Sequence, residues 1–512
     1  MHIAINHKSG IPYASLMNSV REGSRVRKVT VAYLDRVLDE KLGIYQSRER
    51  GVFSYDLATN TYGAAPESFV PNVRRKNGRE ELLVDYGDVY LFESLIKNYG
   101  LQPVLEAVPY GNPDSFRALL LYYMLHRESN AHAECWWSGS YARILYPNAN
   151  LSSQRISDML EAIGREDNMR AFFNAYLEWI GADVREGSNI LIDSTGLPNG
   201  IRFPLTAVSN HNGEISEEVR LIYVSQQGTR LPIYMRYVPG NVVDTTTLTT
   251  TIKELKAMGV NTKFAILDAG YVTEEGMASL SEEKISFLTR CPTNRRIYKQ
   301  LIEKELPDLD QTGSLALDEE GRLFNGREVY VKCVEVDYNG MKLYAYIGRD
   351  KAMQEEERKK FVRRHVGERI NEADFRSGLS EHGVFMLLAT RRIQATQILS
   401  HYYVRQDVEQ VFDIAKNYAS LLPLNVEKEE TFRGHLLMTF IATAILQKLQ
   451  NDLRPSQFSI DRVLMRMRTQ KAKVFENVVI PAEPVREHNE IYKLLEVKPV
   501  KEHARKDAAR MW

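Results

Sequence analysis

The segment SNILIDSTGLP, Ser188–Pro198, sets the fold prediction because a short apolar run within it ends in an aspartate, Asp193. A second run of this kind, KFAILDAG at residues 263–270, ends in Asp268. Short apolar runs bounded by small and turn-forming residues are typical of buried β-strands. The two runs therefore predict two strands that each carry a carboxylate at one end.

The sequence around these runs alternates between strand and helix patterns. Residues 217–228 and 230–240 predict two neighbouring strands, and residues 285–292 predict another strand. Helices are predicted at 245–259 and 273–284. The resulting order favours a mixed α/β sheet with helices on its faces.

Carboxylates at the ends of neighbouring strands can converge on one point, and a carboxylate from a helix laid against the sheet can join them. Three such groups supply the hard oxygen ligands that Mg²⁺ or Mn²⁺ prefers. Two ions about 3.5–4 Å apart can then activate a hydroxyl nucleophile and stabilise the leaving oxygen in phosphoryl transfer. A single strand-end aspartate is more often an Asx-turn or a helix cap, so Asp193 or Asp268 alone decides nothing.

The segment SHYYVRQDVEQVFDIAKNYAS, Ser400–Ser420, predicts one helix with an unusual polar stripe. At about 100° per residue, Tyr402, Arg405, Glu409 and Lys416 fall within roughly 60° of one another, at the rim of the apolar face. An Arg405–Glu409 pair at i, i+4 could be an ordinary helix ion pair worth about 0.2–0.5 kcal/mol. That interpretation leaves Tyr402 and Lys416 unexplained, so the stripe favours a cleft or a partner.

Composition describes a globular chain without overall charge. The 512 residues are 44% hydrophobic, and 67 Lys and Arg balance 67 Asp and Glu. A polyanion site must therefore come from local clusters of charge. Three cysteines far apart, Cys135, Cys291 and Cys333, exclude the usual four-ligand zinc spacing and indicate a reducing compartment. Without an evident signal peptide or an apolar run of about 20 residues, we expect a cytoplasmic protein.

The pattern of predicted elements divides the chain into six regions. One helix of the second region, residues 151–164, could read a DNA groove, although a packing helix is the favoured interpretation. The regions are a strand-rich N-terminal part (1–84), a helical and DNA-binding part (85–187), the first half of the catalytic core (188–292), a β-rich insertion (293–381), the second half of the core (382–450) and a helical, basic C-terminal part (451–512).

Tyr402, Arg405, Glu409 and Lys416 follow the spacing Y-x2-R-x3-E-x6-K. This spacing resembles the signature of a large family of bacterial insertion-sequence transposases with a DDE catalytic triad. The segments LIDSTG with Asp193 and AILDAGYV with Asp268 resemble the first and second acidic motifs of the family, and FRGHLLMTFIATAIL resembles its downstream helix. The resemblance covers residues 185–450.

The resemblance implies a ribonuclease-H-like α/β core, a mixed five-stranded sheet flanked by helices. It implies that Asp193, Asp268 and Glu409 are catalytic and hold two Mg²⁺ or Mn²⁺ ions. Tyr402, Arg405 and Lys416 would bind DNA at the transposon end.

The implied activity is cut-and-paste DNA transposition. Its partners would be the terminal inverted repeats, target DNA and a second copy of the chain in a homodimer, in the bacterial cytoplasm at the nucleoid. Two alternatives are a catalytically inactive DNA-binding descendant and a nuclease of the same fold without strand transfer.

Overall fold

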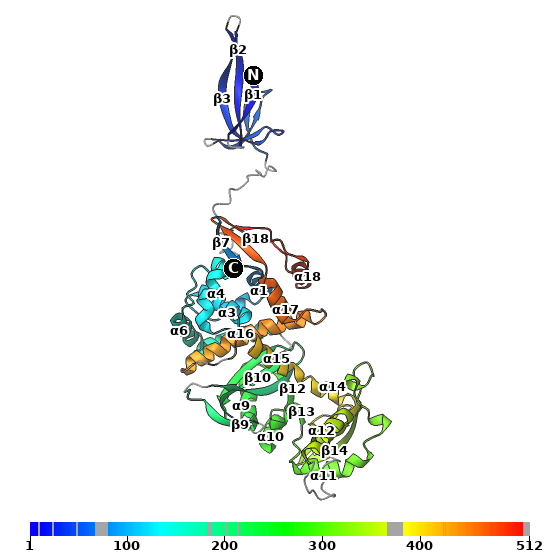
Figure 1. Cartoon of the computed structure of the whole chain (residues 1–512). Helices are drawn as coiled ribbons and strands as arrows, with labels where there is room; N and C mark the ends of the chain where they lie inside the picture. Colours follow the sequence, from blue (N-terminus) through cyan, green and yellow to red (C-terminus); the bar gives the residue numbers. More distant parts are fainter. Residues whose placement is uncertain are drawn as a thin grey trace. The chain divides into compact units, whose positions relative to one another are not determined.

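The computed structural model describes residues 1–8, 11–22, 25–47, 50–66, 80–181, 184, 187–199, 203–211, 214–242, 244–271, 273–365, 382–422, 424 and 426–504. The chain divides into two compact units, Met1–Arg79 and Glu80–Trp512 (Figure 1). The end of the predicted insertion, residues 366–381, and the basic tail after residue 504 lie outside the described residues.

The N-terminal unit is an antiparallel sheet in which consecutive strands are neighbours. Its small core consists of Ala14, Leu16, Leu34, Tyr45, Phe53 and Tyr55. The alternating sequence of this part produces the strands, because side chains on a strand point to opposite faces in turn. The strands are β1 (His2–Lys8), β2 (Ile11–Glu22), β3 (Arg25–Asp39), β4 (Ile44–Ser47), β5 (Gly51–Asp56) and β6 (Thr61–Ala64).

The second unit contains a nine-stranded mixed sheet in the order β11-β10-β8-β12-β13-β16-β15-β14, with β9 paired to β10. Strand β12 runs parallel to both β8 and β13, and the other pairs are antiparallel. The strands are β8 (Ser188–Pro198), β9 (Ala207–His211), β10 (Glu214–Gln226), β11 (Pro232–Pro239), β12 (Thr262–Leu267), β13 (Ser286–Arg290), β14 (Val329–Tyr338), β15 (Met341–Asp350) and β16 (Val384–Ala389).

The sheet is larger than the five strands predicted, because the insertion adds strands to it. Strands β14 and β15 form a hairpin at Asn339-Gly340, where both residues have positive φ (52° and 80°), as a type I′ turn requires. Strand β15 also pairs with β16, which in turn pairs with β13. Helices α11 (Arg296–Glu305) and α12 (Lys351–Arg364) flank the hairpin in sequence.

Helices cover both faces of the sheet at β8, β10 and β12. Alternate residues of these strands pack against α9 (Asp244–Ala257) and α10 (Glu274–Glu282). The residues between them pack with α15 (Gln406–Asn417) and α16 (Glu429–Leu453). Burial on both faces explains the continuous apolar runs in the sequence.

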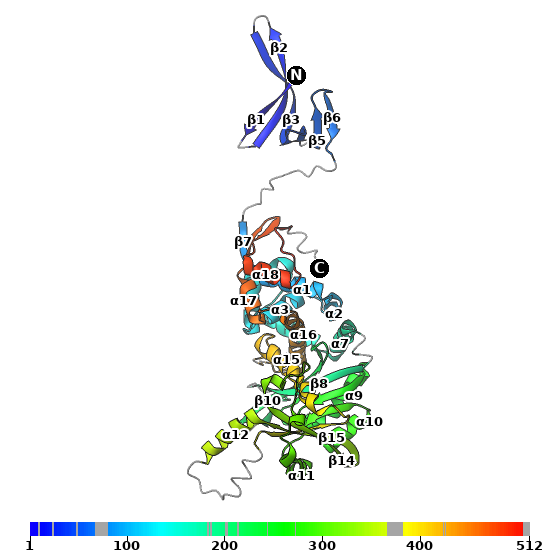
Figure 2. The same cartoon turned by 90° about the vertical axis from the view of Figure 1, so that its right-hand side faces the viewer.

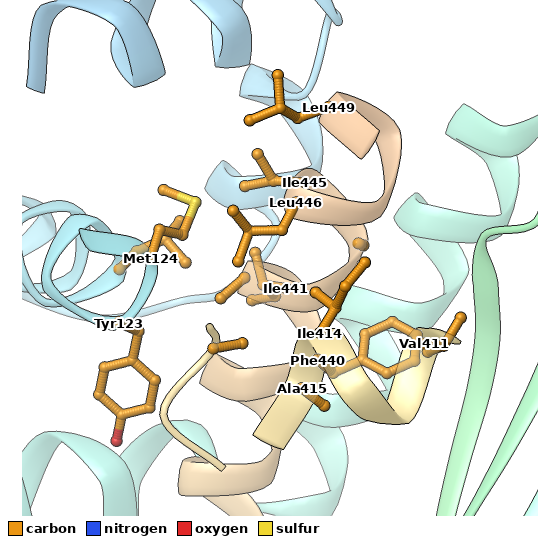
Figure 3. Packing of buried hydrophobic residues seen from close by; sticks show 14 of the residues in the cluster. Tyr123, Met124, Val411, Ile414, Ala415, Phe440, Ile441, Ile445, Leu446 and Leu449 are labelled. Atoms are coloured by element: carbon orange, nitrogen blue, oxygen red, sulfur yellow. The ribbon is translucent and has the colours of Figure 1, made fainter. Parts of the chain in front are cut away.

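Helix α16 connects the sheet to a helical layer formed by residues 87–180. Its Phe440 ring contacts Tyr223 of β10 as well as Phe172, Phe173 and Tyr176 of α7. Figure 3 shows the same helix packed between α15, with Val411, Ile414 and Ala415, and α3, with Tyr123 and Met124. The layer comprises α1 (Gly87–Asn98), α2 (Gln102–Glu106), α3 (Pro113–Leu125), α4 (Ala133–Gly139), α5 (Ala142–Leu145), α6 (Ser153–Ile163) and α7 (Glu166–Ile180).

Helix α6 lies directly against α16. A Cβ atom at Gly434 would stand 1.9 Å from the Leu160 carbonyl oxygen, and one at Gly164 would stand 1.9 Å from the Glu430 carbonyl oxygen. The glycines therefore allow the two backbones to touch. The apolar face of α6, which includes Ile156 and Leu160, is buried there, as a packing helix requires.

The sequence predicts a helical C-terminal region. In the structure this region also contributes three strands to a small sheet in the order β19-β18-β17-β7. Strand β17 forms a local hairpin with β18, and its other partner, β7, lies almost 400 residues earlier, at Glu80–Asp85. The elements are α17 (Ile460–Arg468), β17 (Lys471–Phe475), β18 (Val478–Pro481), α18 (Arg486–Leu494) and β19 (His503–Ala504). Across the described ranges, no helix is both long and apolar enough to cross a membrane.

Candidate active site

The two aspartates lie side by side on neighbouring parallel strands. Ile192 of β8 is in register with Leu267 of β12, and Asp193 and Asp268 are the next residues of each chain segment. Asp268 follows the end of its strand, as predicted. Asp193 does not, because β8 continues to Pro198 through its antiparallel pairing with β10. It is instead the first residue after the parallel ladder with β12 ends.

Strand alternation directs both carboxylates toward helix α15. Leu191 of β8 and Ile266 of β12 belong to the cluster that includes α15 and α16, and each precedes its aspartate by two residues. Residues two apart on a strand share a face. Asp193 and Asp268 therefore project from the face that α15 covers.

The predicted helix over residues 400–420 consists of two helices. Helix α14 (Ile398–Tyr403) ends before Arg405, and α15 begins at Gln406. Backbone bonds of the i→i+3 type join them, from Arg405 N–H to the Tyr402 carbonyl and from Val408 N–H to the Arg405 carbonyl. The chain winds more tightly there than in an α-helix. A single helical wheel is therefore wrong across this joint, although it holds for Glu409 and Lys416 within α15.

Packing fixes α15 on the sheet directly above Asp193. The ring of Phe412 stacks on Tyr223 of β10, with centroids 5.1 Å apart and planes at 16°. Tyr223 is the residue in register with Asp193 on the neighbouring strand. Val408 and Val411 are fully buried on the same side of α15, which leaves Glu409 at its edge.

The guanidinium of Arg405 lies between all three predicted acids. Its Nη1 atom is 3.5 Å from Asp193 Oδ2 and 3.3 Å from Asp268 Oδ1, and its Nη2 atom is 2.6 Å from Glu409 Oε1. Side-chain exposure rises from 15% for Asp193 to 43% for Asp268 and 51% for Glu409. The three carboxylates thus line a site that is closed at Asp193 and open to solvent at Glu409.

Burial dominates the electrostatics of the closed side. It raises the pKa of Asp193 to about 7, against the opposing effects of Arg405 and of the Ser194 backbone N–H. Burial likewise raises the pKa of Tyr402 to about 12, with Arg405 opposing the shift. For Arg405 itself burial acts to lower the pKa, but Asp268 and Asp193 outweigh it, so the pKa is raised and the side chain is a permanent cation.

Lys416 lies on helix α15, as Glu409 does, but its side chain is directed toward β8 rather than toward the three acids. Its Nζ atom donates to the Thr195 hydroxyl at 2.5 Å, two residues beyond Asp193. Burial lowers the pKa of Lys416, and the nearby Glu218 carboxylate opposes this. Thr195 was not among the predicted site residues, although the small, hydroxyl-bearing residues after Asp193 could have indicated it.

The donor set fits a hard divalent cation. Three carboxylates from β8, β12 and α15 surround a positive group, and oxygen ligands are the type that Mg²⁺ and Mn²⁺ take. In the described residues no three acidic, histidine or cysteine side chains are close enough together to coordinate one ion. Arg405 contacts all three acids, so a positive group already lies among these carboxylates in the structure.

The sequence of the catalytic region matches a known family. Residues 187–445, slightly more than half of the 512, match the model of the transposase DDE domain. The chain belongs to the transposase DDE domain family. The transposase is an enzyme of DNA transposition, and members of this family use divalent metal ions.

Two solved structures are similar to the transposase at low identity. The piggyBac transposase synaptic complex with hairpin DNA is 12% identical, with 75% of this chain and 70% of that chain covered and a TM-score of 0.36. The Drosophila P element transposase strand transfer complex is 11% identical, with 73% and 87% covered and a TM-score of 0.20. No curated protein sequence matches the chain.

Proposed function

We propose that this transposase catalyses cut-and-paste transposition, with Asp193, Asp268 and Glu409 as its catalytic carboxylates. The observation that supports this assignment is their convergence on one cation, Arg405, from three different elements. Asp193 and Glu409 are 216 positions apart in the sequence, yet both contact one guanidinium. Such convergence is expected of a site that binds charged groups. Five strands, β11-β10-β8-β12-β13, with helices on both faces, would form the ribonuclease-H-like core.

Asp193, Asp268 and Glu409 would hold two Mg²⁺ or Mn²⁺ ions. When bound, such ions activate the attacking hydroxyl and stabilise the leaving oxygen of a phosphodiester. Asp193 would have to be ionised to hold a cation, and Arg405 would have to give up its contacts with the carboxylates. The freed guanidinium is then available to pair with a phosphate of the DNA through two parallel hydrogen bonds.

Tyr402 and Lys416 would flank the scissile phosphate on either side of the carboxylates. Lys416 is half-buried beside Thr195, so it offers a positioned point charge rather than a mobile surface lysine. The partners of the enzyme would be the terminal inverted repeats, the target DNA and a second copy of the chain in a homodimer.

A donor–target assay tests the proposal. Purified protein is mixed with Mn²⁺, a short DNA carrying both ends of the element and a supercoiled target plasmid. We expect double-strand cleavage at the ends and covalent joining of the donor to the plasmid. Cleavage without joining would support the nuclease alternative, and binding without cleavage would support an inactive descendant.

A further inference from the structure

The β2–β3 hairpin of the N-terminal unit extends beyond its hydrophobic support. Near the base of the hairpin, Leu16 and Leu34 are fully buried. Farther along, the side chains of residues 18–21 and 26–31 are all exposed. A ribbon that packs on a core buries alternate side chains, so both faces of this end are free. Figure 2 shows the hairpin running past the short strands β5 and β6 of the same unit.

The free end of the hairpin is basic. It carries Arg21, Arg27 and Lys28, all exposed, and the only acid of residues 18–33 is Glu22, whose side chain lies outside the described residues. The whole unit, residues 1–79, has 13 Lys and Arg against 7 Asp and Glu, a net charge of +6. Since the chain is neutral, residues 80–512 carry −6. The neutral total therefore conceals a cationic unit.

The strand register places cations on both faces of the hairpin. Arg27 is opposite Val20, and Lys28 is opposite Ser19. Directly opposed side chains lie on one face, and successive residues lie on opposite faces. Arg27 and Lys28 therefore point to opposite sides. This distribution suits a ligand with negative charge on both flanks, rather than a flat anionic surface.

We propose that the β2–β3 hairpin enters the major groove of DNA at the transposon end and supplies part of its recognition. The major groove, about 12 Å wide, admits a two-stranded β-ribbon between its two phosphate walls. The inference rests on the proposed function, because it requires that DNA be the substrate.

The test compares two double variants of the full-length protein that remove equal charge from exposed sites. Arg27→Ala/Lys28→Ala alters the hairpin, and Lys8→Ala/Lys41→Ala alters other parts of the same unit. Fluorescence anisotropy without divalent metal measures binding to duplexes that tile the DNA on either side of the gene, with random duplexes of equal length for comparison. Thermal unfolding of each variant verifies that it is folded.

We expect the hairpin variant to lose about two phosphate contacts, which lowers the salt slope by about 1.8. Between 50 and 200 mM salt, the affinity of the wild-type protein should then fall roughly tenfold more than that of the variant. Replacing thymine by a base with a bulky C5 substituent, which fills the major groove, should weaken wild-type binding more than binding of the hairpin variant.

A hairpin variant with the wild-type slope, or a control variant with the same loss, would overturn the assignment. So would wild-type binding that is insensitive to the bulky C5 substituent. If the wild-type protein cleaves the flanking duplexes in these cases, the proposed function stands and only the hairpin assignment fails. If the wild-type protein neither prefers nor cleaves any flanking duplex, both fail together.

Discussion

Replacing Asp193 by asparagine should stabilise the metal-free protein at alkaline pH. Folding raises the pKa of Asp193 from 3.8 to about 7 because the carboxylate is buried. Between these two values the folded protein binds more protons than the unfolded chain, so wild-type stability falls as the pH rises through this window. The asparagine side chain stays neutral at every pH in this range, so the variant should not show this loss.

The size of the effect follows from the shift. A change in the pKa of Asp193 from 3.8 to about 7 lowers the free energy of unfolding of the wild type at alkaline pH by an amount on the order of 4 kcal/mol. For a unit the size of Glu80–Trp512 that amounts to a difference in melting temperature of about 4 °C. Wild type and Asp193→Asn should melt together near pH 4 and separate progressively up to about pH 8, with the variant more stable.

Differential scanning calorimetry in EDTA, at several pH values, measures this separation. Asp407→Asn is a matched control, because the Asp407 side chain is 16% exposed, nearly the same as Asp193, but is paired with Arg230 and Arg454. That variant should be less stable than wild type, since it leaves two arginines without their partner. A difference in melting temperature between wild type and Asp193→Asn that stays constant from pH 4 to pH 8 would refute the reasoning.

Added Mn²⁺ at 100 times its dissociation constant should stabilise the wild type by about 2.7 kcal/mol and the variant by less.

Four further variants probe individual contacts. Glu409→Gln should lower end cleavage roughly a thousandfold while DNA binding stays unchanged in a gel-shift assay, and normal cleavage would exclude Glu409 as a catalytic residue. Lys416→Ala should reduce the salt slope of end binding by about one, and an unchanged slope would mean that this lysine touches no phosphate. Arg405→Ala should bind Mn²⁺ more tightly in titration calorimetry, because the guanidinium competes with the ion for the three carboxylates. The same variant should bind DNA more weakly. Equal Mn²⁺ affinity of variant and wild type would contradict the competition. Gly434→Ala should destabilise the protein by about 2 kcal/mol, since its Cβ would stand 1.9 Å from the backbone carbonyl oxygen of Leu160, whereas Gly228→Ala, with nothing within 4 Å, should be neutral. Equal melting temperatures would show that helices α6 and α16 can move apart there.

Local pattern was sufficient to predict the elements that carry the acids. The apolar runs before Asp193 and Asp268 predict buried strands, and the structure contains β8 and β12 there. The turn of the β14–β15 hairpin is equally local, because Asn339-Gly340 alone favours the type I′ geometry.

Features that depend on distant parts of the chain were not predictable. Strand β17 pairs on one side with the nearby β18 and on the other with β7, and nothing near Lys471 indicates the pairing with β7. The tight joint at Arg405 is also a tertiary effect, since the residues before and after it have ordinary helix patterns. The i, i+4 pair of Arg405 with Glu409 was one of the alternatives the sequence offered, and the resemblance assigned the guanidinium to DNA. Its contacts with Asp193 and Asp268 depend on the folded sheet.

Helix α16 has a practical consequence for anyone dissecting this enzyme. The family match ends at residue 445, inside the helix, which continues to Leu453. A fragment trimmed to the matched residues would discard Leu446 and Leu449 and uncover Phe440, whose aromatic neighbours on α7 would be gone. Exposed apolar surface of this extent promotes aggregation. The catalytic region of this transposase thus depends on packing against helices that carry no catalytic motif.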